Sequence, residues 1–149
     1  MRSWSIVAVL AMMTAACGGA EKGAFAGTWA GTKSIAVDAG PAALVPGMLV
    51  AISDDGHGSL RLNGLAPARI TSATTFEALP VTFATTYGPG YQGPGQGTTT
   101  VTGGAGRLTA TDSLTITLDF AEDEGGTVRT YRATYTLERS TAAGAGSSL

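Results

Sequence analysis

The stretch Ser113–Phe120, SLTITLDF, decides the fold because apolar and polar side chains alternate along it without exception. Successive side chains of a β-strand point to opposite faces of the sheet, so the alternation predicts a strand buried on one face and exposed on the other. After the turn sequence EDEGG, Val128 leads into the stretch Tyr131–Leu137, which alternates in the same way. The end of the chain therefore predicts two successive half-buried strands.

Shorter runs with the same period of two cover most of the remaining sequence. The other predicted strands are Phe25–Val37, Met48–Ser53, Leu60–Leu62, Arg69–Ser72, Thr74–Leu79, Val81–Tyr87, and Thr98–Thr102 continued after a kink as Arg107–Ala110. Asp55-Gly56 provides a hairpin turn between the second and third of them. Two segments rich in Gly and Pro, Asp38–Gly47 and Gly88–Gly97 (GPGYQGPGQG), are predicted connections, and Gly103–Gly106 is a predicted kink.

Eight or nine antiparallel strands in sequence order predict an all-β fold, a small up-and-down β-barrel of about eight strands. Closing the sheet removes the exposed edges that would otherwise pair with other chains. A two-sheet β-sandwich is the alternative, since alternation alone does not separate the two. The inward-facing aromatic candidates are Trp29, Phe76, Phe83, Phe120, Tyr131 and Tyr135. Their bulk predicts a mostly filled interior.

Composition restricts the possible functions. The chain of 149 residues has a formal net charge of −2 and no basic cluster, so we expect no nucleic-acid partner. Its single cysteine, Cys17, excludes an intrachain disulfide, and stability must come from burial. The length suits one domain with one core.

The first residues are typical of a secretory signal peptide. Arg2 precedes the apolar run Trp4–Met13, which the small residues Ala15 and Ala16 follow. The run is shorter than the roughly 20 residues that a membrane-spanning helix needs. We therefore expect an export signal over residues 1–16.

The end of this signal, Thr14-Ala15-Ala16-Cys17, resembles the lipobox of bacterial lipoproteins, although that motif most often has Leu at the position of Thr14. The resemblance implies cleavage before Cys17 and lipid on its sulfur, with Gly18 typical of the outer-membrane class. The expected organisation is a signal peptide (1–16), a lipidated tether (17–24), a β-barrel domain (25–139) and a disordered tail (140–149). The alternative is a plain signal peptide with Cys17 left as an unpaired thiol.

A second resemblance concerns the first predicted strand. Gly27-Thr28-Trp29 is similar to the G-x-W signature of lipocalins and their smaller barrel relatives, and Arg139 resembles the arginine that packs over that tryptophan. The resemblance implies that Trp29 plugs the closed end of a barrel while Arg139 covers its ring and caps backbone carbonyls. The alternative is a core tryptophan with an unrelated surface arginine.

Candidate catalytic groups are few. His57 lies beside Asp54 and Asp55, but Asp, Gly and His are ordinary hairpin-turn residues, so we expect no metal there. The acidic run Glu122–Glu124 lacks the ligand spacing of a calcium loop. Known catalytic and phosphate-binding motifs are absent from the sequence. We therefore expect no cofactor and no enzyme activity, and a hydrolase using His57 is the last of the alternatives.

The sequence favours a binding role at the cell envelope. If the barrel has a pocket, its mouth is predicted at the Gly88–Gly97 loop, where Tyr87, Tyr91 and Gln92 offer aromatic area and hydrogen bonds. The leading hypothesis is a lipid-anchored, non-catalytic binding module for a small apolar ligand or an envelope protein. The alternative is an anchored inhibitor that presents this loop to a secreted hydrolase.

Overall fold

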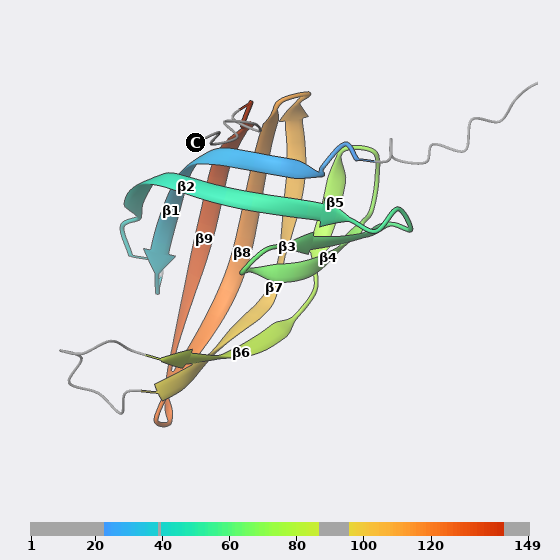
Figure 1. Ribbon diagram of the computed structural model, residues 1–149. Helices are drawn as coiled ribbons and strands as arrows, with labels where there is room; N and C mark the ends of the chain where they lie inside the picture. The colour runs from blue at the N-terminus through green and yellow to red at the C-terminus, as the bar shows by residue number, and fades with distance from the viewer. Residues whose placement is uncertain (1–22, 39, 87–95, 142–149) are drawn as a thin grey trace, which may run out of the picture.

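The computed structural model describes residues 23–38, 40–86 and 96–141, which form an all-β fold (Figure 1). The described residues form nine strands: β1 (Gly27–Val37), β2 (Ala43–Asp54), β3 (Ser59–Leu62), β4 (Ala66–Ile70), β5 (Thr75–Ala78), β6 (Val81–Thr86), β7 (Gln96–Ala110), β8 (Ser113–Glu124) and β9 (Thr127–Arg139).

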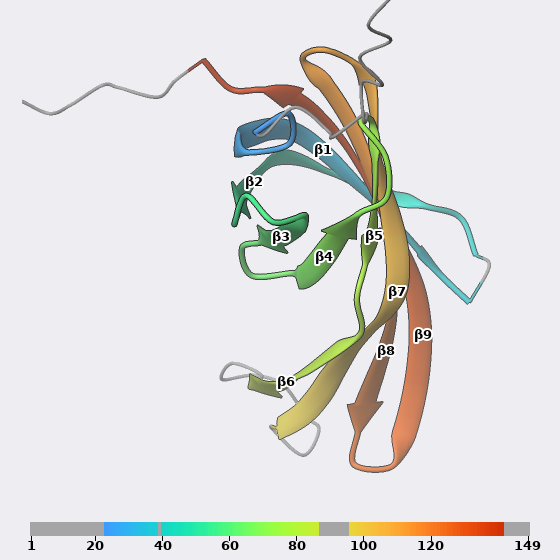
Figure 2. The same cartoon turned by 90° about the vertical axis from the view of Figure 1, so that its right-hand side faces the viewer.

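The nine strands make one antiparallel sheet that curls into a barrel-like ring. Neighbours in the sheet follow the order β5-β4-β3-β2-β1-β9-β8-β7-β6, and β5 also pairs with β7. This last pairing closes a ring of hydrogen bonds through eight strands. β5 and β6 pair one after the other with the same edge of β7 (Figure 2). The predicted up-and-down antiparallel barrel is confirmed in this form, and the chain does not form two separate sheets.

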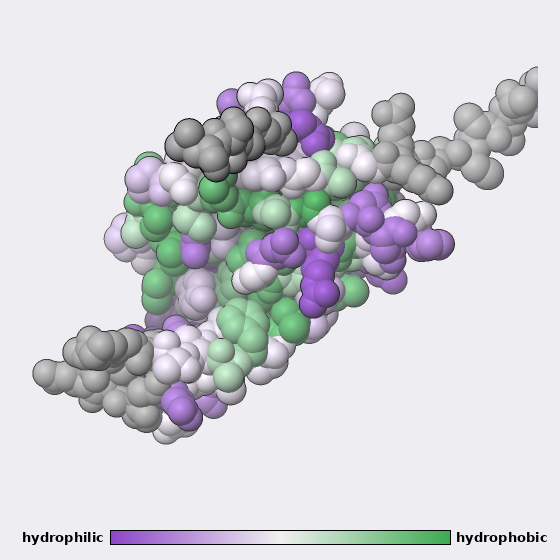
Figure 3. Space-filling view, in the orientation of Figure 1, coloured by the Kyte–Doolittle hydropathy of each residue, from purple (hydrophilic) through white to green (hydrophobic). Residues whose placement is uncertain are grey.

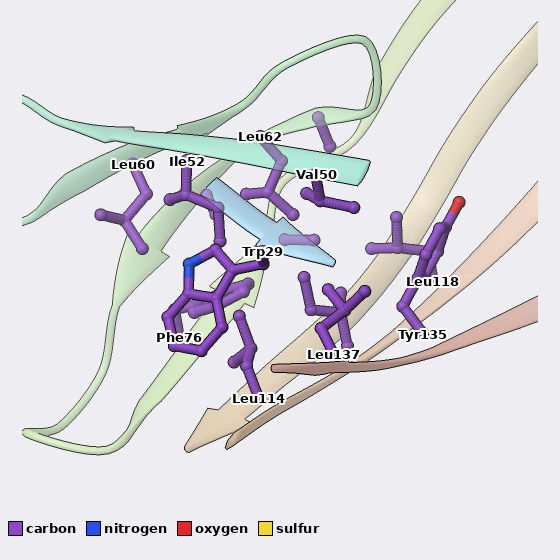
Figure 4. Packing of buried hydrophobic residues seen from close by; sticks show 14 of the residues in the cluster. Trp29, Val50, Ile52, Leu60, Leu62, Phe76, Leu114, Leu118, Tyr135 and Leu137 are labelled. Carbon is purple, nitrogen blue, oxygen red and sulfur yellow. The ribbon is translucent and has the colours of Figure 1, made fainter. Parts of the chain in front are cut away.

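The core lies inside the ring, on the face to which the alternating apolar residues point. In the β8–β9 pair, Leu114 lies opposite Leu137 and Ile116 opposite Tyr135, so both strands place their apolar positions on the same face. All four side chains are at most 1% exposed. We call this face of the sheet the inner face. Trp29 packs on it among side chains from several strands (Figure 4).

β7 passes close to the core because it is rich in glycine. A Cβ atom added at Gly106 would overlap the ring of Phe76, which is 1% exposed on the neighbouring β5. The predicted kink at Gly103–Gly106 is therefore part of one continuous strand. The register shift between Val101 and Gly103 marks the irregularity.

Two strand boundaries differ from the sequence expectation. Residues Ala43–Gly47 were predicted to be part of a connection but belong to β2, where Pro46 and Gly47 form a bulge opposite β1. A bulge tolerates proline because no ladder hydrogen bond is required from it. The strand predicted at Arg69–Ser72 lies earlier, as β4, and includes Pro67. Proline and glycine residues therefore masked, at the level of sequence, strands that are stabilised by pairing with their neighbours in the sheet.

The two ends of the ring differ. One end of the ring, here called the open end, holds Val37 of β1, the Thr86–Gln96 pair of β6 and β7 and the turn between β8 and β9, whereas Gly27 and Arg139 lie at the other, here called the closed end. β3 and β4 are short, so in the described chain the first half of β2 pairs only with β1, and β6 pairs only with β7. The wall is therefore incomplete between β2 and β6 (Figure 2).

Candidate functional site

At the closed end, the structure brings Gly27, Trp29 and Arg139 together. The Arg139 guanidinium carbon lies 4.3 Å from the centroid of the Trp29 ring, which is fully buried. Arg139 also donates hydrogen bonds to the carbonyls of Ala26, at 2.7 Å, and Ala24, at 2.6 Å. The indole Nε1 of Trp29 donates to the Phe25 carbonyl at 2.9 Å. The cluster ties the entering chain to the last strand, which is a structural role.

Position 27 requires glycine for two reasons: its backbone has a positive φ, and there is little space for a side chain. Its φ is +131°, and an added Cβ would lie 3.0 Å from the guanidinium of Arg139. Gly23 and Ala24, placed in the tether by the sequence analysis, also contact the domain. Gly23 N donates to Asp54 at 3.3 Å, and Ala24 accepts from Arg139.

The inner face changes from packed to accessible toward the open end. On β1, Trp29 is fully buried but Val37, on the same face, is 47% exposed. On β2, Val50 is 1% exposed and Val45 37% exposed. Phe83 on β6 faces inward as predicted, since it pairs with Thr99, but it is 39% exposed and lies outside the packed core. The reason is that the wall facing it is incomplete.

Figure 3 shows where hydrophobic residues reach the surface on one side of the molecule. Hydrophobic residues gather over β6 and at the side of the molecule formed by β1 and β2. Deeper on the same inner face, Phe120 and Tyr131 stack with ring centroids 4.8 Å apart. Burial, with a smaller effect of the Glu122 charge, raises the pKa of Tyr131. The inner face near the open end therefore carries aromatic and aliphatic side chains, with Glu122 and Arg129 nearer the rim.

Lys33 is a cation on this face, between Arg139 at the closed end and Arg129, which lies opposite Glu122 nearer the open end. Lys33 pairs with Tyr135 across β1 and β9, and its ammonium nitrogen lies 5.6 Å from the centroid of that ring. Burial lowers the pKa of Lys33. Burial, with a smaller effect of Tyr131, raises the pKa of Tyr135 to about 12. Both groups are therefore less solvated than surface side chains.

The histidine candidate lies in the β2–β3 turn. Asp55 accepts backbone hydrogen bonds from His57 at 2.7 Å and Ser59 at 3.1 Å, and these lower the pKa of its carboxyl. The His57 ring lies 2.9 Å from the Asp55 carbonyl. These are the contacts of a tight turn. Within the described residues, no group of three or more His, Cys, Asp or Glu side chains could hold a metal.

Four predicted site residues lie outside the described residues: Cys17, Tyr87, Tyr91 and Gln92. The ends of the loop segment are nevertheless placed, because Thr86 pairs with Gln96 at the open end. Thr86 and Gln96 lie beside the accessible part of the inner face.

Two of the recesses on the described surface lie at the outer face and at the closed end. One, of about 540 Å³, involves the ion pair between Arg132 and Asp119, whose nitrogen and oxygen are 2.7 Å apart. Both residues lie on the outer face. Another, of about 720 Å³, lies at the closed end beside Ala24 and Arg139. Neither contains an arrangement of catalytic groups.

Sequence reasoning missed Lys33, Val37 and Val45 as members of a site. Lys33 has the same parity as Trp29, so the alternation would have placed it on the inner face. Val45 gave no such signal because Pro46-Gly47 interrupted the pattern. The wall is incomplete because β3 and β4 are short. The alternation of apolar and polar residues does not predict strand length.

Comparison of the chain with models of protein families, with curated proteins and with solved structures found no match. The described residues contain no helix capable of crossing a bilayer.

Proposed function

We propose that this protein is a non-catalytic binding module that holds a small apolar ligand on the inner face near its open end. The observation that supports this most directly is the change in exposure along single strands. Trp29 and Val37 share the inner face of β1, yet the first is fully buried and the second 47% exposed. Apolar side chains that are left accessible on a concave, otherwise packed face favour a ligand.

The proposal includes a lipid anchor on Cys17 at the cell envelope, most consistent with the outer membrane. The described chain begins at Gly23, which is held beside Asp54. Five residues lie between Cys17 and Gly23, so an extended tether would span at most about 20 Å. The bilayer would then lie near the closed end, and the accessible inner face would point away from it.

The anchor is tested by fractionation of the producing cells. Cys17→Ser should leave the protein soluble or unprocessed, while the wild type sediments with membranes. Cys17→Ala serves as a second variant, and Asp38→Ser as a control that leaves the motif intact. Membrane attachment of both Cys17 variants would contradict the lipobox assignment.

Ligand binding is tested first by native mass spectrometry of protein purified from its host, which should retain a small molecule. Binding of an apolar fluorescent probe should then be weakened several-fold by Val45→Ser. The matched control is Leu44→Ser, because Leu44 is the adjacent residue on the outer face and is 69% exposed. Equal effects of the two variants would contradict an inner-face site.

A second candidate function is binding to another envelope protein. It is favoured by the outer face of β2, where Leu44 and Leu49 are 69% and 67% exposed. Under this alternative, Leu49→Ser should abolish capture of a partner that is identified by crosslinking on intact cells, and Val45→Ser should not. The inhibitor hypothesis remains a prediction, and loss of a co-purified hydrolase on deletion of Gly88–Gly97 would support it.

A further inference from the structure

We infer that the ligand is an anionic amphiphile, whose headgroup binds between Lys33 and Tyr135 and whose apolar chain runs toward the open end. This inference rests on the proposed function and specifies the chemical class of the ligand. It is argued from a cation, a buried hydroxyl and an accessible apolar surface that share one face of the sheet.

Lys33 provides the positive charge. It lies opposite Tyr135 on β9 and opposite Val45 on β2, so both of its neighbours in the sheet place uncharged side chains beside it. The ion pairs of the described residues involve Arg69, Arg132 and Arg139, and none involves Lys33. A half-buried cation beside apolar groups gains from an anion that enters the same low-dielectric surroundings.

Tyr135 provides a hydrogen-bond donor. Its side chain is 1% exposed, and its hydroxyl is the one buried side-chain polar atom of the described chain that has no hydrogen-bond partner. Buried polar groups are nearly always paired, since an unpaired one costs free energy. Figure 4 shows this hydroxyl at the edge of the packed cluster, on the side away from Trp29. An oxygen atom of a carboxylate or similar headgroup at Lys33 would accept a hydrogen bond from the Tyr135 hydroxyl.

The apolar chain follows β1 outward from Lys33. Ile35 and Val37 share the inner face with Lys33, and Val37 lies opposite Tyr131. From Lys33 to Val37 the strand rises about 13 Å at about 3.3 Å per residue, enough to contact an alkyl chain of medium length. Phe83 on β6 adds further accessible apolar area.

The charged residues on the inner face determine which end of the ligand lies inward. Glu122 lies two residues beyond Phe120 on β8, and its charge raises the pKa of Tyr131. Glu124 follows at the rim, and both residues make further interactions of their own. Arg129 lies opposite Glu122 in the sheet, so an anion near Tyr131 would meet charges of both signs, whereas at Lys33 it meets a cation whose sheet neighbours are uncharged and beyond which the core is packed. The headgroup therefore lies inward and the chain outward.

The test uses three probes with the same alkyl chain: laurate, dodecanol and dodecyltrimethylammonium. Binding to the mature wild-type protein is measured by displacement of an apolar fluorophore and by calorimetry. We expect laurate to bind at least tenfold more tightly than dodecanol, and the trimethylammonium compound most weakly. Lys33→Met should remove the preference for laurate while leaving dodecanol within about twofold of its wild-type affinity.

Tyr135→Phe should weaken laurate several-fold with little effect on dodecanol. Arg61→Met is the control for loss of a cation, because Arg61 is exposed on β3 and outside the inner face. Neither substitution at Lys33 or Tyr135 is expected to unfold the protein, since each replaces a poorly solvated polar group with an apolar one. Thermal unfolding of each variant checks this.

Equal binding of laurate and dodecanol by the wild type would overturn the inference but leave the proposed function standing. A laurate affinity that is unchanged in Lys33→Met would overturn it as well. If no probe binds the wild type, the proposed function itself fails. An unchanged laurate affinity in Tyr135→Phe would show that the hydroxyl is satisfied by water and would contradict its assigned role.

Discussion

At the scale of single residues, the closed end depends on Arg139. Its guanidinium contacts the Trp29 ring and donates to the carbonyls of Ala24 and Ala26. Each hydrogen bond holds a residue that precedes the first strand against the last strand of the sheet. One side chain therefore joins the two ends of the domain and shields a fully buried tryptophan.

Replacing Arg139 with Met should destabilise the fold by about 2–3 kcal/mol, because charge-assisted hydrogen bonds and a cation–π contact are lost together. In a chain lacking residues 1–16, Trp29 is the sole tryptophan, so its fluorescence reports urea unfolding directly. Arg61→Met should change the free energy of unfolding by less than about 0.5 kcal/mol. Similar midpoints for wild type and Arg139→Met would contradict this account of the closed end.

A second residue-scale prediction concerns Gly106. Its replacement by Ala places a methyl group in the space of the Phe76 ring and should cost about 1–3 kcal/mol by overpacking. Gly103→Ala is the matched control, because a Cβ there meets no atom within 4 Å. Chemical denaturation compares the two, and an equal cost would show that Phe76 does not pack against β7 in solution.

At the scale of elements, the β2–β3 hairpin is organised by the Asp55 carboxylate. It accepts from the backbone N–H groups of His57 and Ser59, which lower the pKa of Asp55. A lowered folded-state pKa means that the contribution to stability is complete above the ordinary carboxyl pKa. It is lost as pH falls through the lowered pKa.

Asp55→Ala should therefore lower the urea midpoint at neutral pH, and its difference from wild type should shrink below about pH 4. Asp55→Asn keeps an acceptor atom but carries no charge, so its deficit at neutral pH should be smaller than that of Asp55→Ala and should likewise shrink at acidic pH, because only the wild type titrates at this position. A wild-type advantage over Asp55→Ala that persists unchanged at acidic pH would contradict the role of the carboxylate.

The elements were predicted from the sequence where alternation was uninterrupted. β8 and β9 were recognised because their apolar positions face a packed core along most of their length. The first part of β2 was missed because Pro46 and Gly47 are typical of loops, whereas here they form a bulge that pairing with β1 supports. The local sequence does not show whether a neighbouring strand will pair with a segment that contains proline and glycine.

At the scale of the whole molecule, the packed end and the accessible end follow from unequal strand lengths. Long strands such as β7 and β9 run from one end to the other, whereas β3 and β4 cover only the closed half. The sequence predicted the ring and its aromatic core. It did not predict Phe83 as exposed, because exposure depends on which strands extend far enough to cover it.

A prediction at this scale concerns alkaline stability. Burial raises the pKa of Tyr135 from 10.0 to about 12, so the unfolded chain loses this proton first and the fold loses stability between these pH values. The lowered pKa of Lys33 acts with the opposite sign, raising stability as pH climbs toward 10.5. Tyr135→Phe should flatten the loss above pH 10 by roughly 1–2 kcal/mol in urea titrations. An identical pH profile would contradict the burial of the hydroxyl.

The central claim is that one face of the sheet is packed at the closed end and open to ligand at the other. NMR with methyl-labelled protein and laurate tests it most directly. We predict intermolecular contacts from the alkyl chain to methyl groups of Ile35, Val37 and Val45, and none to Ile116 or Leu137. Contacts confined to Leu44 and Leu49 on the outer face, or an absence of contacts at saturating laurate, would contradict it.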